Sequence, residues 1–265
     1  MRHYDRAWAE IDLDALQFNV ASIRKCIDQG TKIIAVIKTD GYGHGASQIA
    51  QLLEDERQVW GYAVATAEEA FSLRADGIQK PILILGYTFP YSYGQMISGQ
   101  VRATVFTCEA AEALSDIAVA SGQICRIHIK IDTGMTRIGI HPDDEGVALI
   151  RRIAGLPGLE IEGIFTHFAA SDEADKTSAV RQYEKFNRFV EKLESEGITF
   201  EIKHCANSAA VIDMPYTHKD MVRLGIAMYG MYPSEETGRG RVFLTPALRL
   251  VSRVIFVKTI GAGEA

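Results

Sequence analysis

The feature that most restricts the fold of this chain is a regular alternation of short apolar runs with longer amphipathic stretches. The apolar runs lie at 33–37, 60–64, 82–85, 103–106, 125–131, 159–165, 200–204 and 221–224. Stretches with apolar residues at helical spacing lie between them, at 45–54, 66–75, 108–120, 143–154 and 178–196. Strands that alternate with helices form parallel sheets through right-handed crossovers. About eight such units in about 250 residues predict a (β/α)8 TIM-type barrel, with a doubly wound open sheet as the alternative.

Both ends of the chain depart from this alternation. Residues 8–13 predict a strand, followed by a helix that begins near Asp12 or Asp14, where Asp14 and Gln17 resemble a capping pair, and that ends before Gly30. Beyond the barrel, a polar segment that contains glycine is followed by alternating apolar and polar residues with no further helix.

We therefore expect three parts. Residues 1–233 form the barrel, although the strand at 8–13 can pack with the following domain. Residues 234–246 form a linker, and 247–265 form the first strand of a truncated C-terminal β domain.

Composition excludes several classes of function. The 265 residues include 28 Lys and Arg against 34 Asp and Glu, a net charge of −6, and their short basic segments are too small for a nucleic-acid footprint. No apolar run approaches the roughly 20 residues of a membrane span. Residues 1–10 lack the apolar region of a signal peptide, and the four cysteines show no CxxC spacing. These features predict a cytoplasmic protein with reduced thiols.

A metal site is not expected. His204 and Cys205 are adjacent in the sequence, but neighbouring residues of a strand point to opposite faces of a sheet. The pair is therefore a poor metal clamp.

Polar residues gather where the predicted strands end, which is the active-site face of a parallel barrel. The candidate site residues there are Lys38, Tyr42, Lys130, Arg137, His167, Asn207, Ser208 and Arg223, together with Gly225 and Ile226, which offer backbone N–H groups. A lysine in this position can form a Schiff base or carry a proton, although it can also simply reach the barrel rim. The glycines of 41–45 suit close approach of an anion, but a plain turn uses the same residues.

The remaining residues also allow two interpretations. Asn207, Ser208 and the backbone after Arg223 offer phosphate donors at helix starts, whereas Asn207 alone can be a helix cap. A histidine such as His167 on an apolar strand is more often a hydrogen-bonded core residue, and Arg137 and Arg223 can form ordinary ion pairs at the rim. Together, a lysine, a phosphate cradle and two arginines indicate a phosphate-bearing aldehyde cofactor, pyridoxal 5'-phosphate.

Five segments of the chain resemble the bacterial alanine racemases, which are fold-type III pyridoxal-phosphate enzymes. They are Ala-Val-Ile-Lys-Thr-Asp-Gly-Tyr-Gly-His-Gly at 35–45, Ile-Asp-Thr-Gly-Met-Thr-Arg at 131–137, Thr-His-Phe-Ala at 166–169, His-Cys-Ala-Asn-Ser-Ala at 204–209 and Met-Val-Arg-Leu-Gly-Ile-Ala-Met-Tyr-Gly at 221–230. The segments follow the order of the family, and the similarity runs from Trp8 to the end. The resemblance implies a barrel followed by a β domain, in a homodimer with active sites at the subunit interface.

The resemblance also implies a role for each site residue. Lys38 binds the cofactor as a Schiff base and exchanges the α-proton of the D-enantiomer. The phosphate is held by Tyr42, Asn207, Ser208, Gly225 and Ile226. Arg223 faces the pyridine nitrogen, keeps it unprotonated and restricts side reactions.

Three further roles are implied around the cofactor. His167 is hydrogen-bonded toward Arg223, and Arg137 meets the substrate carboxylate. Lys130 resembles a lysine that is carbamylated in many members, which would orient Arg137; the alternative is an unmodified lysine paired with Asp132.

The implied activity is the racemisation of L- and D-alanine, which supplies D-alanine for peptidoglycan. The second base of the family is a tyrosine in the β domain of the partner subunit, and we expect this chain to lack it, because it should follow Glu264. One alternative is a serine or broad-specificity amino-acid racemase. Another is a non-catalytic pyridoxal-phosphate homeostasis protein, which would not need residues 204–209 or a strand after 246.

Overall fold

The computed structural model describes residues 6–264, and its centre is one sheet of eight parallel strands. The strands are β2 (Lys32–Val36), β3 (Val59–Val64), β4 (Ile82–Ile84), β5 (Val101–Val105), β6 (Cys125–Lys130), β7 (Leu159–Phe165), β8 (Ile202–His204) and β9 (Met221–Leu224). They follow the order β8-β7-β6-β5-β4-β3-β2-β9. Each predicted strand is present, with bounds that differ by at most two residues.

The sheet closes between its two ends, β8 and β9. Asp220 N–H donates to the carbonyl of Lys203 at 3.2 Å, and Arg223 N–H donates to the carbonyl of Ala206 at 3.0 Å. These bonds bring the first and last strands of the order together. The chain is therefore a (β/α)8 barrel, as predicted, and not an open doubly wound sheet.

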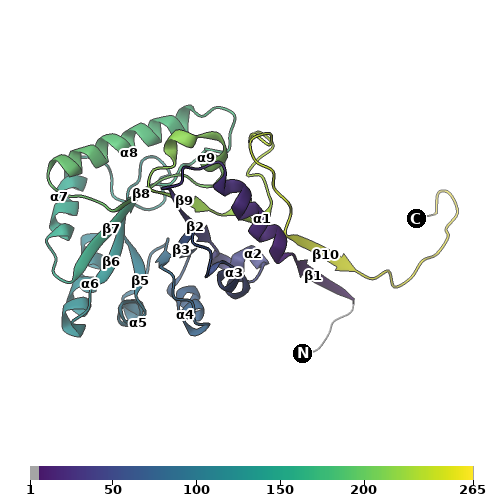
Figure 1. Ribbon diagram of the computed structural model, residues 1–265, viewed down its shortest axis with the longest axis horizontal. Helices are drawn as coiled ribbons and strands as arrows, with labels where there is room; N and C mark the ends of the chain where they lie inside the picture. Colours follow the sequence, from purple (N-terminus) through teal and green to yellow (C-terminus); the bar gives the residue numbers. More distant parts are fainter. Residues whose placement is uncertain (1–5, 265) are drawn as a thin grey trace.

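Helices surround the sheet (Figure 1). They are α1 (Leu13–Arg24), α3 (Ala46–Leu53), α4 (Ala67–Ala75), α5 (Tyr93–Ser98), α6 (Cys108–Ser121), α7 (Asp144–Ala154), α8 (Thr177–Ser195) and α9 (Ser208–Asp213), with single turns at α2 (Lys38–Gly43), η1 (Pro90–Ser92), η2 (Pro215–Thr217) and η3 (Ile226–Tyr229). Among the described residues, none of these helices combines the length and the apolar character needed to cross a bilayer.

The helix after the N-terminal strand begins at Asp12, the first of the two predicted positions, but its cap differs from the prediction. Asp12 is its cap, and the carboxylate of Asp12 accepts from Ala15 N–H at 2.9 Å, so the Asp14–Gln17 pair does not form the cap. A side-chain oxygen that accepts an otherwise unpaired N–H is the usual stabilising element at this position.

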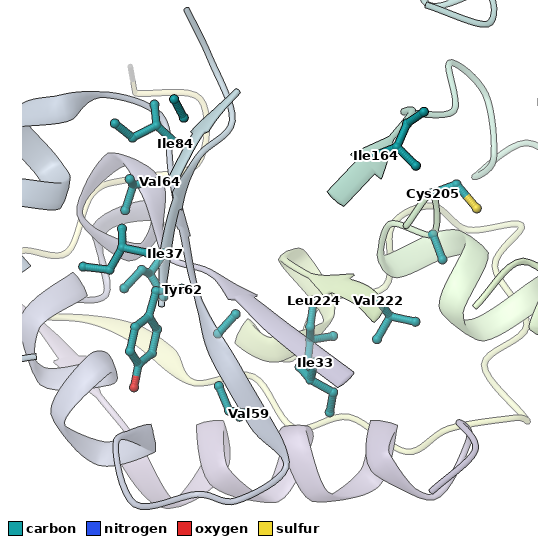
Figure 2. Packing of buried hydrophobic residues seen from close by; sticks show 14 of the residues in the cluster. Ile33, Ile37, Val59, Tyr62, Val64, Ile84, Ile164, Cys205, Val222 and Leu224 are labelled. Atoms are coloured by element: carbon teal, nitrogen blue, oxygen red, sulfur yellow. The ribbon is translucent and has the colours of Figure 1, made fainter. Parts of the chain in front are cut away.

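Two groups of buried apolar side chains hold the barrel together. The larger lies between the strands and the helices, where Ile33, Val64 and Leu224 pack (Figure 2). The smaller lies inside the barrel, and its buried members are Ile34, Val36, Ala63, Leu83, Ile202 and Met221. These residues come from only five of the eight strands, β2, β3, β4, β8 and β9. The other three strands, β5, β6 and β7, contribute the polar side chains Arg102, His128 and Glu162 to the interior.

A second, two-stranded sheet projects from the barrel (Figure 1). In it β1 (Ala7–Ile11) pairs antiparallel with β10 (Leu248–Ser252). The predicted strand at 247–265 is thus shorter than expected, because β1 offers only five residues for pairing.

The predicted linker, 234–246, lies against the barrel. Val242 and Leu244 are buried, and the Asn19 side chain bonds both backbone groups of Thr245. The division into domains stays a prediction, and residues 1–5 and 265 lie outside the described residues.

Candidate active site

A cavity of about 400 Å³ opens at the carboxyl ends of the barrel strands. Its lining includes every site residue predicted from the sequence: Lys38, Tyr42, Lys130, Arg137, His167, Asn207, Ser208, Arg223, Gly225 and Ile226. Val36, Leu85, Phe165 and Phe168 add apolar walls. The structure therefore brings together residues that are separated by up to 188 positions, because the parallel strands all end at the same rim.

Lys38 is half-buried and opens an unusual turn directly after β2. The next four residues, Thr39, Asp40, Gly41 and Tyr42, all have left-handed backbone angles, with φ of 56°, 53°, 60° and 53°. Three of them carry a Cβ, and this conformation costs roughly 1–2 kcal/mol for each such residue. Strain of this kind persists only where the surroundings impose it, and it is concentrated at functional sites.

Glu69, on the first turn of α4, holds this left-handed turn. One carboxylate oxygen accepts Thr39 N–H at 2.6 Å, and the other accepts Ala65 N–H at 2.7 Å. Asp40 adds a second anchor by accepting Ala46 N–H at 2.8 Å. Glu69 therefore connects the end of β3 to the residue that follows Lys38, a role that the sequence analysis missed.

Tyr42 lies beside the lysine. The Lys38 Nζ is 5.8 Å from the centre of the Tyr42 ring, and that ring meets Tyr229 edge-on at 5.3 Å. Tyr229 is fixed in turn by donating to the Val36 carbonyl at 2.9 Å. Burial, together with the charge of Glu69, raises the pKa of Tyr42, so its hydroxyl is a donor at neutral pH.

A set of polar groups lies across the cavity at the start of α9. Asn207 caps this helix by accepting Ala210 N–H at 3.1 Å, as the simpler interpretation predicted, and its amide N–H groups are the donors it can offer to an anion. Ser208 Oγ accepts the N–H groups of Gly225 at 3.1 Å and Ala227 at 3.3 Å. The serine thus joins the two loops that supply the predicted phosphate donors, and its hydroxyl proton can point to a ligand.

Gly225 keeps the space between these loops open. A Cβ at this position would lie 3.8 Å from Ser208 Oγ, 3.8 Å from Val36 Cβ and 4.0 Å from the Tyr42 hydroxyl. A side chain here would occupy the point at which the polar groups converge. The donors and the space between them fit a phosphate group.

Arg223 is buried and bonded on two sides. Its guanidinium donates to His167 Nδ1 at 3.0 Å, to His204 Nδ1 at 3.2 Å and to the Cys205 carbonyl at 2.9 Å. Burial lowers the pKa of Arg223 to about 10, which leaves it charged at neutral pH. Burial, reinforced by the Arg223 charge, lowers the pKa of His167 to about 3, so this histidine is a neutral acceptor. His204 was considered only as a metal ligand, and its contact with Arg223 was missed.

Lys130 and Arg137 form the remaining cationic wall. The Lys130 ammonium is buried and donates to the carbonyls of Ile131 at 2.7 Å and Ile138 at 3.2 Å. The alternative pairing with Asp132 is therefore wrong, since Asp132 accepts the N–H groups of Gly134 and Thr136 instead. Burial, and then the charge of Arg223, lowers the pKa of Lys130 to about 8. Arg137 is exposed at the cavity mouth.

Comparison with known proteins identifies the family. The family model described as "Alanine racemase, N-terminal domain" matches residues 11–233. The chain belongs to the alanine racemase family. Among similar proteins, alanine racemase of Desulforamulus reducens is 44% identical over 256 residues, which are 97% of this chain and 69% of that protein.

Two further comparisons agree. Alanine racemase of Clostridium perfringens is 46% identical over 254 residues, or 96% of this chain and 65% of that protein. A solved structure of alanine racemase from Clostridium difficile 630 in complex with cycloserine superposes with a TM-score of 0.94 and 41% identity, and covers 97% of this chain and 71% of that one. The chain thus spans about two thirds of the length of these relatives.

No group of three or more metal-binding side chains occurs within residues 6–264.

Proposed function

We propose that this chain carries the cofactor-binding and substrate-binding part of a pyridoxal-phosphate-dependent alanine racemase. The observation that supports this most directly is the convergence of a lysine, phosphate donors and two arginines on one cavity of about 400 Å³. The relatives that cover nearly the whole chain are named alanine racemase, which favours alanine over the serine alternative.

The residues present fit pyridoxal phosphate. Its aldehyde suits the half-buried Lys38, and its phosphate suits the donors of Tyr42, Asn207 and Ser208 around Gly225. When bound, the cofactor supplies an electron-withdrawing ring that makes the α-proton of an attached amino acid acidic. The cationic lining also matches two anionic groups, the phosphate and a substrate carboxylate.

Each side chain then has a definite task. Lys38 holds the cofactor through Nζ and afterwards accepts or returns the α-proton of the D-enantiomer at the same atom. Arg223 presents a charged guanidinium, which opposes protonation of a pyridine nitrogen beside it. Arg137 binds the substrate carboxylate at the mouth of the cavity.

Lys130 is the candidate for carbamylation. With a pKa of about 8, part of its amine is neutral near pH 7, and only a neutral amine reacts with carbon dioxide. A carbamate would replace a cation with an anion in the wall that also contains Arg137, and so would orient the arginine.

We further propose the wider setting implied by the family: a cytoplasmic homodimer that supplies D-alanine for peptidoglycan, with the second acid–base group contributed from outside residues 1–265. The family match and the named relatives support this setting.

The test is to titrate the protein with pyridoxal phosphate and to record the imine absorbance before and after borohydride reduction. Lys38→Ala should abolish covalent trapping. Lys32→Ala, at the opposite end of β2, is the matched control and should trap the cofactor normally. Covalent trapping at the same site in Lys38→Ala would refute the assignment.

A further inference from the structure

A row of polar side chains, buried except for the half-buried Arg102, runs through the barrel from Arg223 to its opposite end. His204 on β8 contacts His128 on β6, with 3.0 Å between His204 Nε2 and His128 Nδ1. His128 Nε2 is 3.0 Å from the Glu162 carboxylate on β7. Arg102 on β5 donates to both oxygens of that carboxylate, at 3.1 and 3.2 Å. Together with Arg223 on β9, these residues come from five consecutive barrel strands, β5 to β9.

The donors and acceptors in this row have only one consistent direction. Arg223 can only donate, so His204 Nδ1 accepts and His204 Nε2 carries the proton. That N–H donates to His128 Nδ1, which places the His128 proton on Nε2. The His128 N–H then requires an acceptor, and the Glu162 carboxylate is one.

Charge and burial support the same direction. Both histidines are completely buried, and burial lowers the pKa of each, so both are neutral. Burial alone would raise the pKa of Glu162, but the bonds from His128 and Arg102 lower it to about 2, so it is a carboxylate. A buried anion thus lies at one end of two neutral rings, with the Arg223 cation at the other.

The local backbone is shaped around these rings. The pairing of β6 with β7 shifts register between Ile127 and His128, which places Gly163 opposite His128. A Cβ at Gly163 would lie 2.5 Å from His128 Nδ1 and 2.8 Å from the Ile202 carbonyl. Phe165 stacks on His204, with ring centres 4.7 Å apart. The rings therefore have little freedom to turn.

We propose that Glu162 is a positioning residue for Arg223, acting through His128 and His204 by fixing which nitrogen of each ring carries the proton. If the acceptor at Glu162 is lost, the buried His128 N–H has no acceptor, and the rings can reverse their tautomers. With the tautomers reversed, the His204 proton would lie on Nδ1. Two N–H donors, those of His204 and Arg223, would then face each other. Arg223 would then lose one of its three acceptors, and the bonds to His167 and the Cys205 carbonyl alone would hold it at the cavity.

The role of Arg223 toward the cofactor rests on the proposed function, so the experiment has one part without cofactor and one with it. Nitrogen-15 NMR of the histidine rings in the cofactor-free protein reports their tautomers directly. Pyridoxal-phosphate titration, followed by the imine absorbance, reports the cavity.

The variants separate charge from hydrogen bonding. Glu162→Met removes the acceptor, Glu162→Gln keeps an acceptor oxygen but removes the charge, and Glu160→Gln, on the same strand and exposed, is the control. We expect protonated Nε2 on His128 and His204 in the unsubstituted protein and in Glu160→Gln, with mixed tautomers in Glu162→Met. Cofactor affinity should fall by about tenfold in Glu162→Met and less in Glu162→Gln.

Unchanged tautomers and unchanged affinity in both Glu162 variants would overturn the proposal. If Glu162→Met fails to fold, Glu162→Leu, which also lacks an acceptor, decides by the same two measurements. Expected tautomers in a protein that forms no imine absorbance would support the positioning of Arg223 and contradict the proposed function instead.

Discussion

At the scale of single residues, Arg223 determines the charge at the bottom of the cavity. Because a guanidinium opposes a pyridinium and a carboxylate stabilises one, Arg223→Glu should let the cofactor nitrogen take a proton. We expect D-alanine to produce a new long-wavelength absorption band in this variant and more side reactions. Arg223→Lys keeps the positive charge and should show no such band. An unchanged spectrum in Arg223→Glu would remove Arg223 from the cofactor nitrogen.

The lowered pKa of Lys130 predicts a pH dependence of its modification. Because the neutral amine is the form that reacts with carbon dioxide, carbamate formation should rise as the pH increases from 7 through about 8. Carbon-13 NMR with labelled bicarbonate would follow the carbamate signal, and Lys130→Ala should lack it. A signal that is absent at every pH would leave Lys130 as an unmodified cation bonded to two carbonyls.

Site residues could be predicted where a charged or reactive residue type lies at the end of a predicted strand. A lysine, a histidine and two arginines at strand ends are visible in the sequence, and all line the cavity. The contacts of His204 and Glu162 were not predictable, because they depend on the register shift between β6 and β7. No local pattern in the sequence reports which inward side chains will meet across a barrel.

At the scale of elements, the left-handed turn after Lys38 depends on Glu69. Glu69→Ala leaves the N–H groups of Thr39, which is exposed, and of Ala65 without their carboxylate. A hydrogen bond typically contributes about 0.5–1.5 kcal/mol to stability. We expect faster hydrogen exchange at Thr39 and weaker pyridoxal-phosphate binding.

Glu68→Ala is the matched control for this experiment. Glu68 is the neighbouring residue of α4, it is exposed, and its carboxylate accepts from Tyr91 and contacts neither Thr39 nor Ala65. Equal effects of the two substitutions would show that Glu69 does not maintain the turn.

Long helices could be predicted from the sequence, whereas short helices could not. The long helices α6, α7 and α8 match their predicted ranges within one residue, because several turns of apolar periodicity define them. The six-residue helix α5 is too short to show such a period. The turn at α2 was also beyond prediction, because Thr39 and Tyr42 adopt angles that sequence patterns assign to glycine.

At the scale of the whole molecule, charge is distributed unevenly. The chain carries a net charge of −6, yet Lys38, Lys130, Arg137 and Arg223 all line one cavity, where Asp172 is the only acidic lining residue among those described. This concentration of positive charge raises the local concentration of anions at the cavity, while the rest of the molecule keeps its net negative charge. The arrangement suits ligands that carry an anionic group, such as a phosphate or a carboxylate, at one end of the barrel.

The described cavity also limits what this chain can catalyse by itself. Racemisation removes a proton from one face of the α-carbon and delivers one to the other, so two acid–base groups are required. Lys38 is one. His167 is unsuited to be the second acid–base group. Its pKa of about 3 keeps the ring neutral, and its Nδ1 already accepts a hydrogen bond from Arg223. The Lys130 ammonium is engaged by two carbonyls.

We therefore expect the 265-residue chain, loaded with pyridoxal phosphate, to exchange the α-proton of D-alanine with solvent through Lys38 much faster than it forms L-alanine. A missing acid–base group typically slows its step by about 10²–10⁴-fold. NMR in D₂O would follow α-deuteration, and chiral chromatography of the same sample would follow the enantiomers. Lys38→Ala should lose both. Formation of L-alanine at the rate of deuteration would place the second group within this chain, with Asp172 and Tyr42 the lining residues to substitute next.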